Sequence, residues 1–134
     1  MRLPKITLAI GCFVLFSFLF FSPATSYSFD ATIDVAPNVL NIQSQGTVVT
    51  VHTDIAYGDV DVSSVFLNGI LISSWKADDR GNFVAKFSMD EVKSLDGLVI
   101  GGYNTLQLVG VTNDGESFVG EKDIKVIDVM SQGR

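Results

Sequence analysis

The chain has 134 residues, which is enough for one domain with its own hydrophobic core and too few for two. It carries nine Lys and Arg against fifteen Asp and Glu, for a formal net charge of −6 at pH 7. A surface this acidic repels phosphate groups, so we expect no nucleic-acid partner and no attraction to anionic lipid headgroups.

The N-terminus has the layout of a secretory signal peptide. Arg2 and Lys5 precede an uninterrupted apolar block at residues 6–21. We expect this block to be helical and to end at Pro23, because proline interrupts a helix. The next segment, Ala24-Thr25-Ser26, has small residues at both positions that a signal peptidase recognises.

We therefore assign the signal peptide to residues 1–26, with Ser28 as the alternative end. An uncleaved N-terminal anchor is the other interpretation, since no charge occurs between Lys5 and Asp30 and the apolar stretch then extends through Phe29. Contact with a membrane is expected only in that case. With cleavage, the protein is exported to the periplasm or to the outside of the cell.

Export also determines what stabilises the mature chain. The single cysteine, Cys12, lies inside the signal, so the mature protein has no disulfide and depends on packing. Loss of Arg2 and Lys5 leaves seven basic side chains against fifteen acidic ones, a net charge of −8. Cations and basic protein surfaces remain as possible partners.

From residue 31 onward, apolar residues recur with period two, which predicts β-strands. The first strand covers residues 31–35, and a second follows a turn at residues 44–46. His52 and Asp54 are expected on the solvent face of this second strand. Residues 57–61 are expected to be a loop. The side chains expected inward in this part are Ala31, Ile33, Val35, Leu40, Ile42, Val49, Val51 and Ile55.

Two hairpins follow. The first has Asn68-Gly69 between Val65-Phe66-Leu67 and Ile70-Leu71-Ile72, and Asn-Gly readily adopts the positive φ angles of a two-residue turn. The second pairs residues 74–77 with residues 82–87 across a four-residue turn, Asp78-Asp79-Arg80-Gly81. In the second hairpin, Phe83, Ala85 and Phe87 are expected inward and Lys86 outward.

The last part of the chain contains a short helix and two long strands. Ser88 and Glu91 have the spacing of a capping box, which predicts one helical turn. Strands are expected at residues 103–112 and 116–129, with Leu106, Leu108, Phe118, Ile124 and Val126 inward. Seven or eight strands within residues 30–129 predict an all-β fold, an Ig-like antiparallel β-sandwich, and residues 130–134 form a tail.

Several segments resemble an Ig-like module of secreted and surface proteins from bacteria and archaea. They are residues 31–46, 62–69, 84–88, 104–110 and 114–120. The resemblance implies an Ig-like fold and an extracellular accessory role, and it implies no catalytic residues. In similar modules the segment that matches residues 78–83 is often longer and richer in Asp and Asn, as if able to hold calcium. The short form here argues against a calcium site at that position.

Asp54, Asp59 and Asp61 are the remaining candidates for a metal site, a weak calcium site at one loop. Calcium takes six to eight oxygen ligands, and these three residues do not have the spacing of an EF-hand loop. Solvated loop charge is the preferred interpretation. No cofactor is expected.

His52 and Trp75 are the side chains in the sequence that are the strongest candidates for a functional role. His52 is the single histidine, and no serine elbow or metal-ligand spacing accompanies it, so we expect an exposed strand histidine. Trp75 lies between polar residues and has two interpretations. In one, its indole stacks on a sugar or anchors a partner; in the other, which we prefer, it covers the core at the edge of a hairpin.

The sequence therefore predicts an exported, non-catalytic Ig-like module for protein binding, adhesion or scaffolding at the cell envelope or outside the cell. The partner is an unknown protein or glycan. A carbohydrate-binding module that uses Trp75 is the alternative. No catalytic constellation is present in the sequence, so we do not expect an enzyme.

Overall fold

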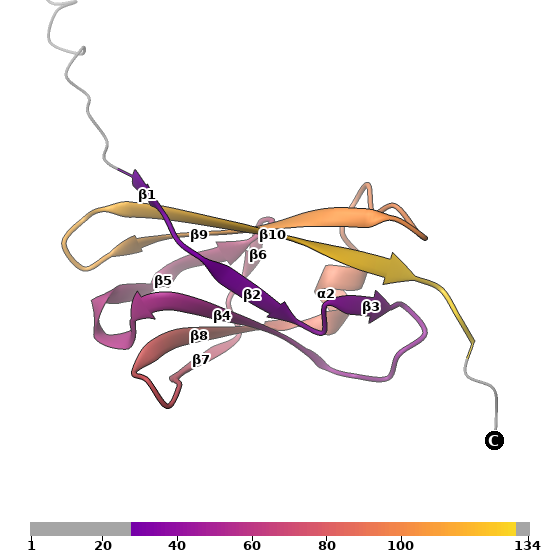
Figure 1. The fold of residues 1–134 in the computed structure, drawn as a ribbon, viewed down its shortest axis with the longest axis horizontal. Helices are drawn as coiled ribbons and strands as arrows, with labels where there is room; N and C mark the ends of the chain where they lie inside the picture. Colours follow the sequence, from indigo (N-terminus) through magenta and orange to yellow (C-terminus); the bar gives the residue numbers. More distant parts are fainter. Residues whose placement is uncertain (1–27, 131–134) are drawn as a thin grey trace, which may run out of the picture.

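The computed structural model describes residues 28–130, which form two stacked β-sheets (Figure 1). The predicted signal peptide and all but the first residue of the predicted tail lie outside the described residues. Within residues 28–130, no helix is long and apolar enough to cross a membrane. The described residues confirm the prediction of an all-β sandwich, although they form ten strands rather than the seven or eight predicted.

One layer is a four-stranded antiparallel sheet. Its strands, in spatial order, are β2 (Ile33–Ala36), β4 (Val48–Ala56), β8 (Asn82–Ser88) and β7 (Ser74–Ala77). Strands β8 and β7 form the second predicted hairpin, with Ala77 opposite Phe83. Strand β7 lies at one edge of this sheet and β2 at the other.

The other layer is a six-stranded sheet. Its main path runs through β1 (Ser28–Asp30), β10 (Ser117–Ile127), β9 (Tyr103–Thr112), β5 (Val60–Leu67) and β6 (Ile70–Leu71), and β3 (Val39–Asn41) pairs further along β10. Strands β1 and β3 run parallel to β10, so the prediction of a purely antiparallel sandwich was wrong in this detail. The N-terminal segment passes from the six-stranded sheet at β1 to the four-stranded sheet at β2 and returns at β3, so that β1 and β3 both lie beside β10 and run in its direction.

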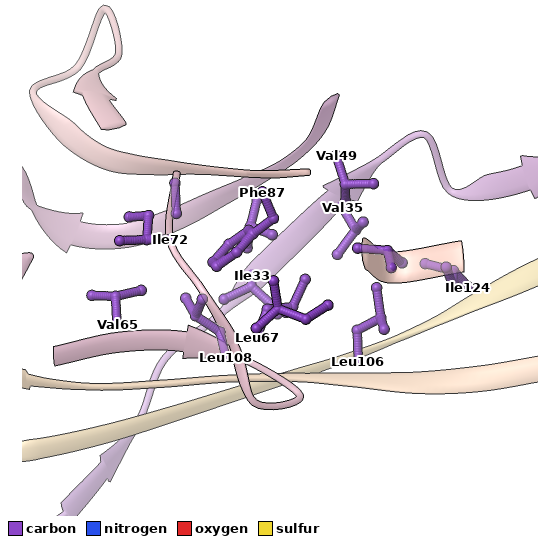
Figure 2. Packing of buried hydrophobic residues seen from close by; sticks show 14 of the residues in the cluster. Ile33, Val35, Val49, Val65, Leu67, Ile72, Phe87, Leu106, Leu108 and Ile124 are labelled. Atoms are coloured by element: carbon purple, nitrogen blue, oxygen red, sulfur yellow. The ribbon is translucent and has the colours of Figure 1, made fainter. Parts of the chain in front are cut away.

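The core lies between the two sheets and follows the predicted alternation. Figure 2 shows side chains from both layers meeting there, among them Val49 and Phe87 from one sheet and Leu106 and Leu108 from the other. Phe87 is fully buried, whereas Lys86 beside it is half-buried and outside the core cluster. The strand register predicted from the sequence is therefore confirmed.

The predicted turns are also present. Asn68 and Gly69 have φ angles of 47° and 85°, as the tight hairpin between β5 and β6 requires. Helix α2 (Met89–Lys93) begins where the Ser88 hydroxyl accepts a hydrogen bond from the Glu91 N–H at 3.4 Å. Met89 and Val92 are buried, so this short helix closes one end of the core.

Several local boundaries differ from the sequence prediction, and β10 is shorter at both ends than the strand predicted at residues 116–129. Residues 57–61 are not one loop, because a short 3₁₀ helix, η1 (Tyr57–Asp59), leads directly into β5 and Val60 is buried. The strand predicted at residues 31–35 is β2, which covers only Ile33–Ala36, and an unpredicted strand, β1, precedes it on the other sheet, where Phe29 packs on Phe118 with ring centroids 6.0 Å apart. An aromatic contact across the sheet thus extends the sandwich at its N-terminal end.

Candidate functional site

A hollow of about 600 Å³ lies on the four-stranded sheet beside the turn between β7 and β8. We call it the hairpin depression. It combines four carboxylates with a lysine, an arginine and the single histidine. Its lining residues are Thr32, Asp34, His52, Thr53, Asp54, Lys76, Ala77, Asp78, Asp79, Arg80 and Asn82.

Strand register explains how three of these side chains come together. Asp34 is opposite His52, His52 is opposite Val84, and Val84 is opposite Lys76, so the four residues form one row across the outer face. Val84 is 0% exposed although it lies on this outer face. We attribute its burial to the larger side chains of His52 and Lys76 on either side of it.

Part of the lining of the hairpin depression comes from Thr53, which lies where the pairing of β4 is irregular. The pairing between β4 and β8 shifts between His52 and Ala56. At this point the Thr53 hydroxyl donates to the Phe83 carbonyl at 2.8 Å and accepts from the Ile55 N–H at 3.1 Å. The hydroxyl replaces ladder bonds that the bulge interrupts, so it has a structural role and is not free to act as a nucleophile.

Asp78 organises the rim of the hairpin depression. Its Oδ1 accepts hydrogen bonds from the Arg80 N–H at 2.8 Å and the Asn82 N–H at 2.9 Å, which forms an Asx turn. The hydrogen bond from the Asn82 backbone lowers the pKa of Asp78, partial desolvation opposes this, and Arg80 and His52 add a smaller lowering. The carboxylate is therefore held ionised by the turn that it shapes.

The structure does not bring Asp54, Asp59 and Asp61 together at one site. Asp54 is on β4 in the four-stranded sheet, where its Oδ1 accepts from the Thr32 N–H at 3.1 Å. Asp61 is on β5 in the six-stranded sheet, and its Oδ1 accepts from the Ser63 N–H at 3.1 Å and the Ser63 hydroxyl at 2.7 Å. Among residues 28–130, no group of three or more His, Cys, Asp or Glu side chains is placed to hold a metal ion.

Trp75 lies outside the hairpin depression, on the edge strand β7. It is opposite Ala85, a core residue, so its side chain is on the inner side of the sheet. It is nevertheless 43% exposed. The indole thus borders the open edge of the sandwich, where part of it remains accessible to a ligand.

A second surface was not recognised from the sequence. It is an apolar row across the outer face of the six-stranded sheet: Leu71 is opposite Phe66, Phe66 is opposite Val109, and Val109 is opposite Val119. We call these four residues the outer apolar row. Leu71 is 55% exposed, and the other three are half-buried yet outside the core cluster.

The sequence contained one signal for this row. The outward residues of β9 are polar at Thr105 and Gln107 and then become apolar at Val109 and Val111. Alternation alone marks Leu106 and Leu108 as the core face. Apolar residues on the opposite face after that point indicate a strand that is apolar on both sides, which a simple inward and outward assignment overlooks.

Comparisons with known proteins assign the chain to no family, since no family model matches and no match was found among curated proteins or solved structures. The Ig-like resemblance therefore remains a prediction.

Proposed function

We propose that this chain is an exported, non-catalytic Ig-like module that binds another protein at the cell envelope or outside the cell. The strand order supports the Ig-like assignment. Strands β2-β4-β8-β7 face strands β10-β9-β5, the order in which Ig-like sandwiches place a four-stranded sheet against a three-stranded one. The signal-like N-terminus at residues 1–26 supports export.

The outer apolar row is the observation that carries the binding function. It crosses four adjacent strands, and the inner side chains of the same strands already fill the core. The exposed Leu71 and the partly exposed Phe66, Val109 and Val119 lie outside that core. Contiguous apolar surface on a folded module is typical of a docking site for another macromolecule.

Photo-cross-linking tests this proposal. A photoreactive residue in place of Leu71 should cross-link to a specific protein in the envelope or extracellular fraction of the source organism. Ile100 is the matched control position, because it is 50% exposed against 55% for Leu71 and lies in a loop away from the row. Adducts that form equally from both positions would contradict binding at this face.

Export is tested separately by the intact mass of the protein recovered outside the cytoplasm. Cleavage by signal peptidase predicts a mature N-terminus at Tyr27 or Phe29. Either start keeps Phe29 in its contact with Phe118. Retention of residues 1–26 in a membrane fraction would show the anchored form instead.

A carbohydrate-binding function that uses Trp75 is the second candidate, favoured by the exposure of the indole at a sheet edge. A sugar ring stacks on an accessible aromatic face. On a glycan array, Trp75→Ala should then abolish a signal that the wild-type protein gives. Tyr103→Ala is the control, because Tyr103 is an aromatic residue with 69% exposure on the other sheet.

A further inference from the structure

We infer that the outer apolar row receives a basic protein segment, one whose apolar side chains are bordered by Lys or Arg. This inference rests on the proposed binding function and names the chemistry of the partner. It is carried by the side chains at the end of the row and along its two sides.

The row ends in an acidic hollow. Val119 is opposite Asp30 of β1, and a hollow of about 290 Å³ there is lined by Asp30, Ala31, Val119 and Glu121. Two carboxylates thus flank the last apolar side chain of the row. This arrangement suits the ammonium or guanidinium group of a long side chain whose methylenes lie on Val119.

Acidic side chains also border the row on both sides. Glu121 and Asp123 follow Val119 along the outer face of β10, and Asp61 is opposite Val111 on the other side. Cross-strand bonds fix the first two: the Gln107 amide donates to Glu121 Oε2 at 2.9 Å, and the Thr105 hydroxyl donates to Asp123 Oδ1 at 2.7 Å. These carboxylates are held in position before a partner arrives, which lowers the entropic cost of pairing with it.

Charge also argues against a second copy of this chain as the occupant. Two copies packed face to face along the row would bring acidic border against acidic border, and each chain already has a net charge of −6. Like charges at an interface are repulsive, whereas a basic border is attracted and steered to the face.

The dimensions fit a short extended segment. The row spans four strands at about 4.8 Å spacing, and an extended chain advances about 3.3 Å per residue, so about five residues cross it. Alternate side chains of such a segment would lie on the row. A suitable probe is therefore a peptide of about ten residues in which Leu and Lys alternate, so that one face is apolar and the charge is basic.

The test is binding of this Leu-Lys peptide to the purified protein, compared with a Leu-Glu peptide and an all-Lys peptide of equal charge. We expect the Leu-Lys peptide to bind at least about tenfold more tightly than either, and to weaken as added salt screens the charges. Leu71→Ser with Val109→Thr should remove the preference over the all-Lys peptide. Asp30→Asn with Glu121→Gln should remove the preference over the Leu-Glu peptide.

Asp79→Asn with Asp96→Asn is the matched control, because it removes two exposed carboxylates elsewhere and should change neither preference. Equal binding of the all-Lys peptide, unaffected by the row variant, would overturn the inference and show general attraction to an acidic protein. Dimers in sedimentation that Leu71→Ser dissociates would also overturn it in favour of a second copy. A specific cross-link from position 71 that survives the Asp30 and Glu121 substitutions would overturn the basic partner and leave the proposed binding function standing.

Discussion

The ring of Phe118 lies directly over the bare backbone of Gly110, its cross-strand partner. A Cβ atom at position 110 would be 2.5 Å from Phe118 Cζ and 2.9 Å from Cε2. The ring is fully buried, and the ring of Phe29 packs on it at a centroid distance of 6.0 Å. Glycine is required here by close approach of an aromatic side chain rather than by a special φ angle.

Gly110→Ala is therefore expected to destabilise the protein, although alanine usually suits a strand better than glycine. The added methyl group displaces the Phe118 ring, and overpacking of this kind costs about 1–3 kcal/mol. Urea denaturation measures the change. Gly58→Ala is the control, since a Cβ there meets nothing within 4 Å, and it should change the free energy of unfolding by less than about 0.5 kcal/mol. A stabilised Gly110→Ala would show that the ring moves aside freely.

Phe87 and Lys86 test the strand register. Phe87 is fully buried between the sheets, whereas Lys86 is on the outer face of β8. We expect Phe87→Ala to cost about 3–5 kcal/mol and Lys86→Ala less than about 0.5 kcal/mol in chemical denaturation. Similar small losses in both variants would mean that the opposite face of β8 is buried.

Much of the fold could be predicted from the sequence because its signals are local. The period-two alternation around Phe87, the Asn68-Gly69 dipeptide and the Ser88 cap each depend on a few neighbouring residues, and each is present in the structure. The N-terminal strands were less predictable. The strands within residues 28–41 are divided between the two sheets. The sheet that each strand joins depends on pairing with residues far away in the sequence, such as Ser117 for β1 and Thr53 for β2.

The candidate surfaces depend even more on tertiary structure. The hairpin depression joins Asp34, His52 and Lys76 from three strands, and only the register of those strands brings them into one row. Likewise, Asp54 and Asp61 are seven positions apart yet lie on different sheets. Sequence proximity suggested a shared cation site there, whereas the chain crosses between the layers at η1 and separates the two carboxylates.

Asp78 should make stability depend on pH below about 4. Its folded-state pKa is lowered from 3.8, first by the hydrogen bond from the Asn82 backbone. The contribution of the ionised carboxylate is thus fully present above 3.8 and is lost as the pH falls through the folded pKa. Asp78→Asn keeps a side-chain oxygen that accepts the turn hydrogen bonds, but the amide does not titrate. The free energy of unfolding of this variant should therefore fall less steeply than that of the wild type as the pH is lowered below about 4.

Denaturant midpoints measured as a function of pH, from about pH 2 to about pH 6, test this effect. Asp79→Asn removes the same charge from the same turn and is the control. An equal flattening in both variants would assign the effect to the net charge of the turn, contrary to a specific role for the Asp78 hydrogen bonds.

Folding is expected to need no calcium. Calcium requires about six to eight oxygens near 2.4 Å. Oδ1 of Asp61 already accepts two hydrogen bonds from Ser63, and Asp54, which is on the other sheet, accepts one from the Thr32 N–H. A residual site with a dissociation constant of about 10 mM would add only about 0.06 kcal/mol at 1 mM calcium. Thermal midpoints in EDTA and in millimolar calcium should therefore agree within about 1 °C. A much larger increase of the thermal midpoint on addition of calcium would contradict this expectation. If Asp59→Asn with Asp61→Asn abolished that increase and Asp79→Asn retained it, the result would establish a cation site at η1 and make cation-dependent adhesion the better account of this module.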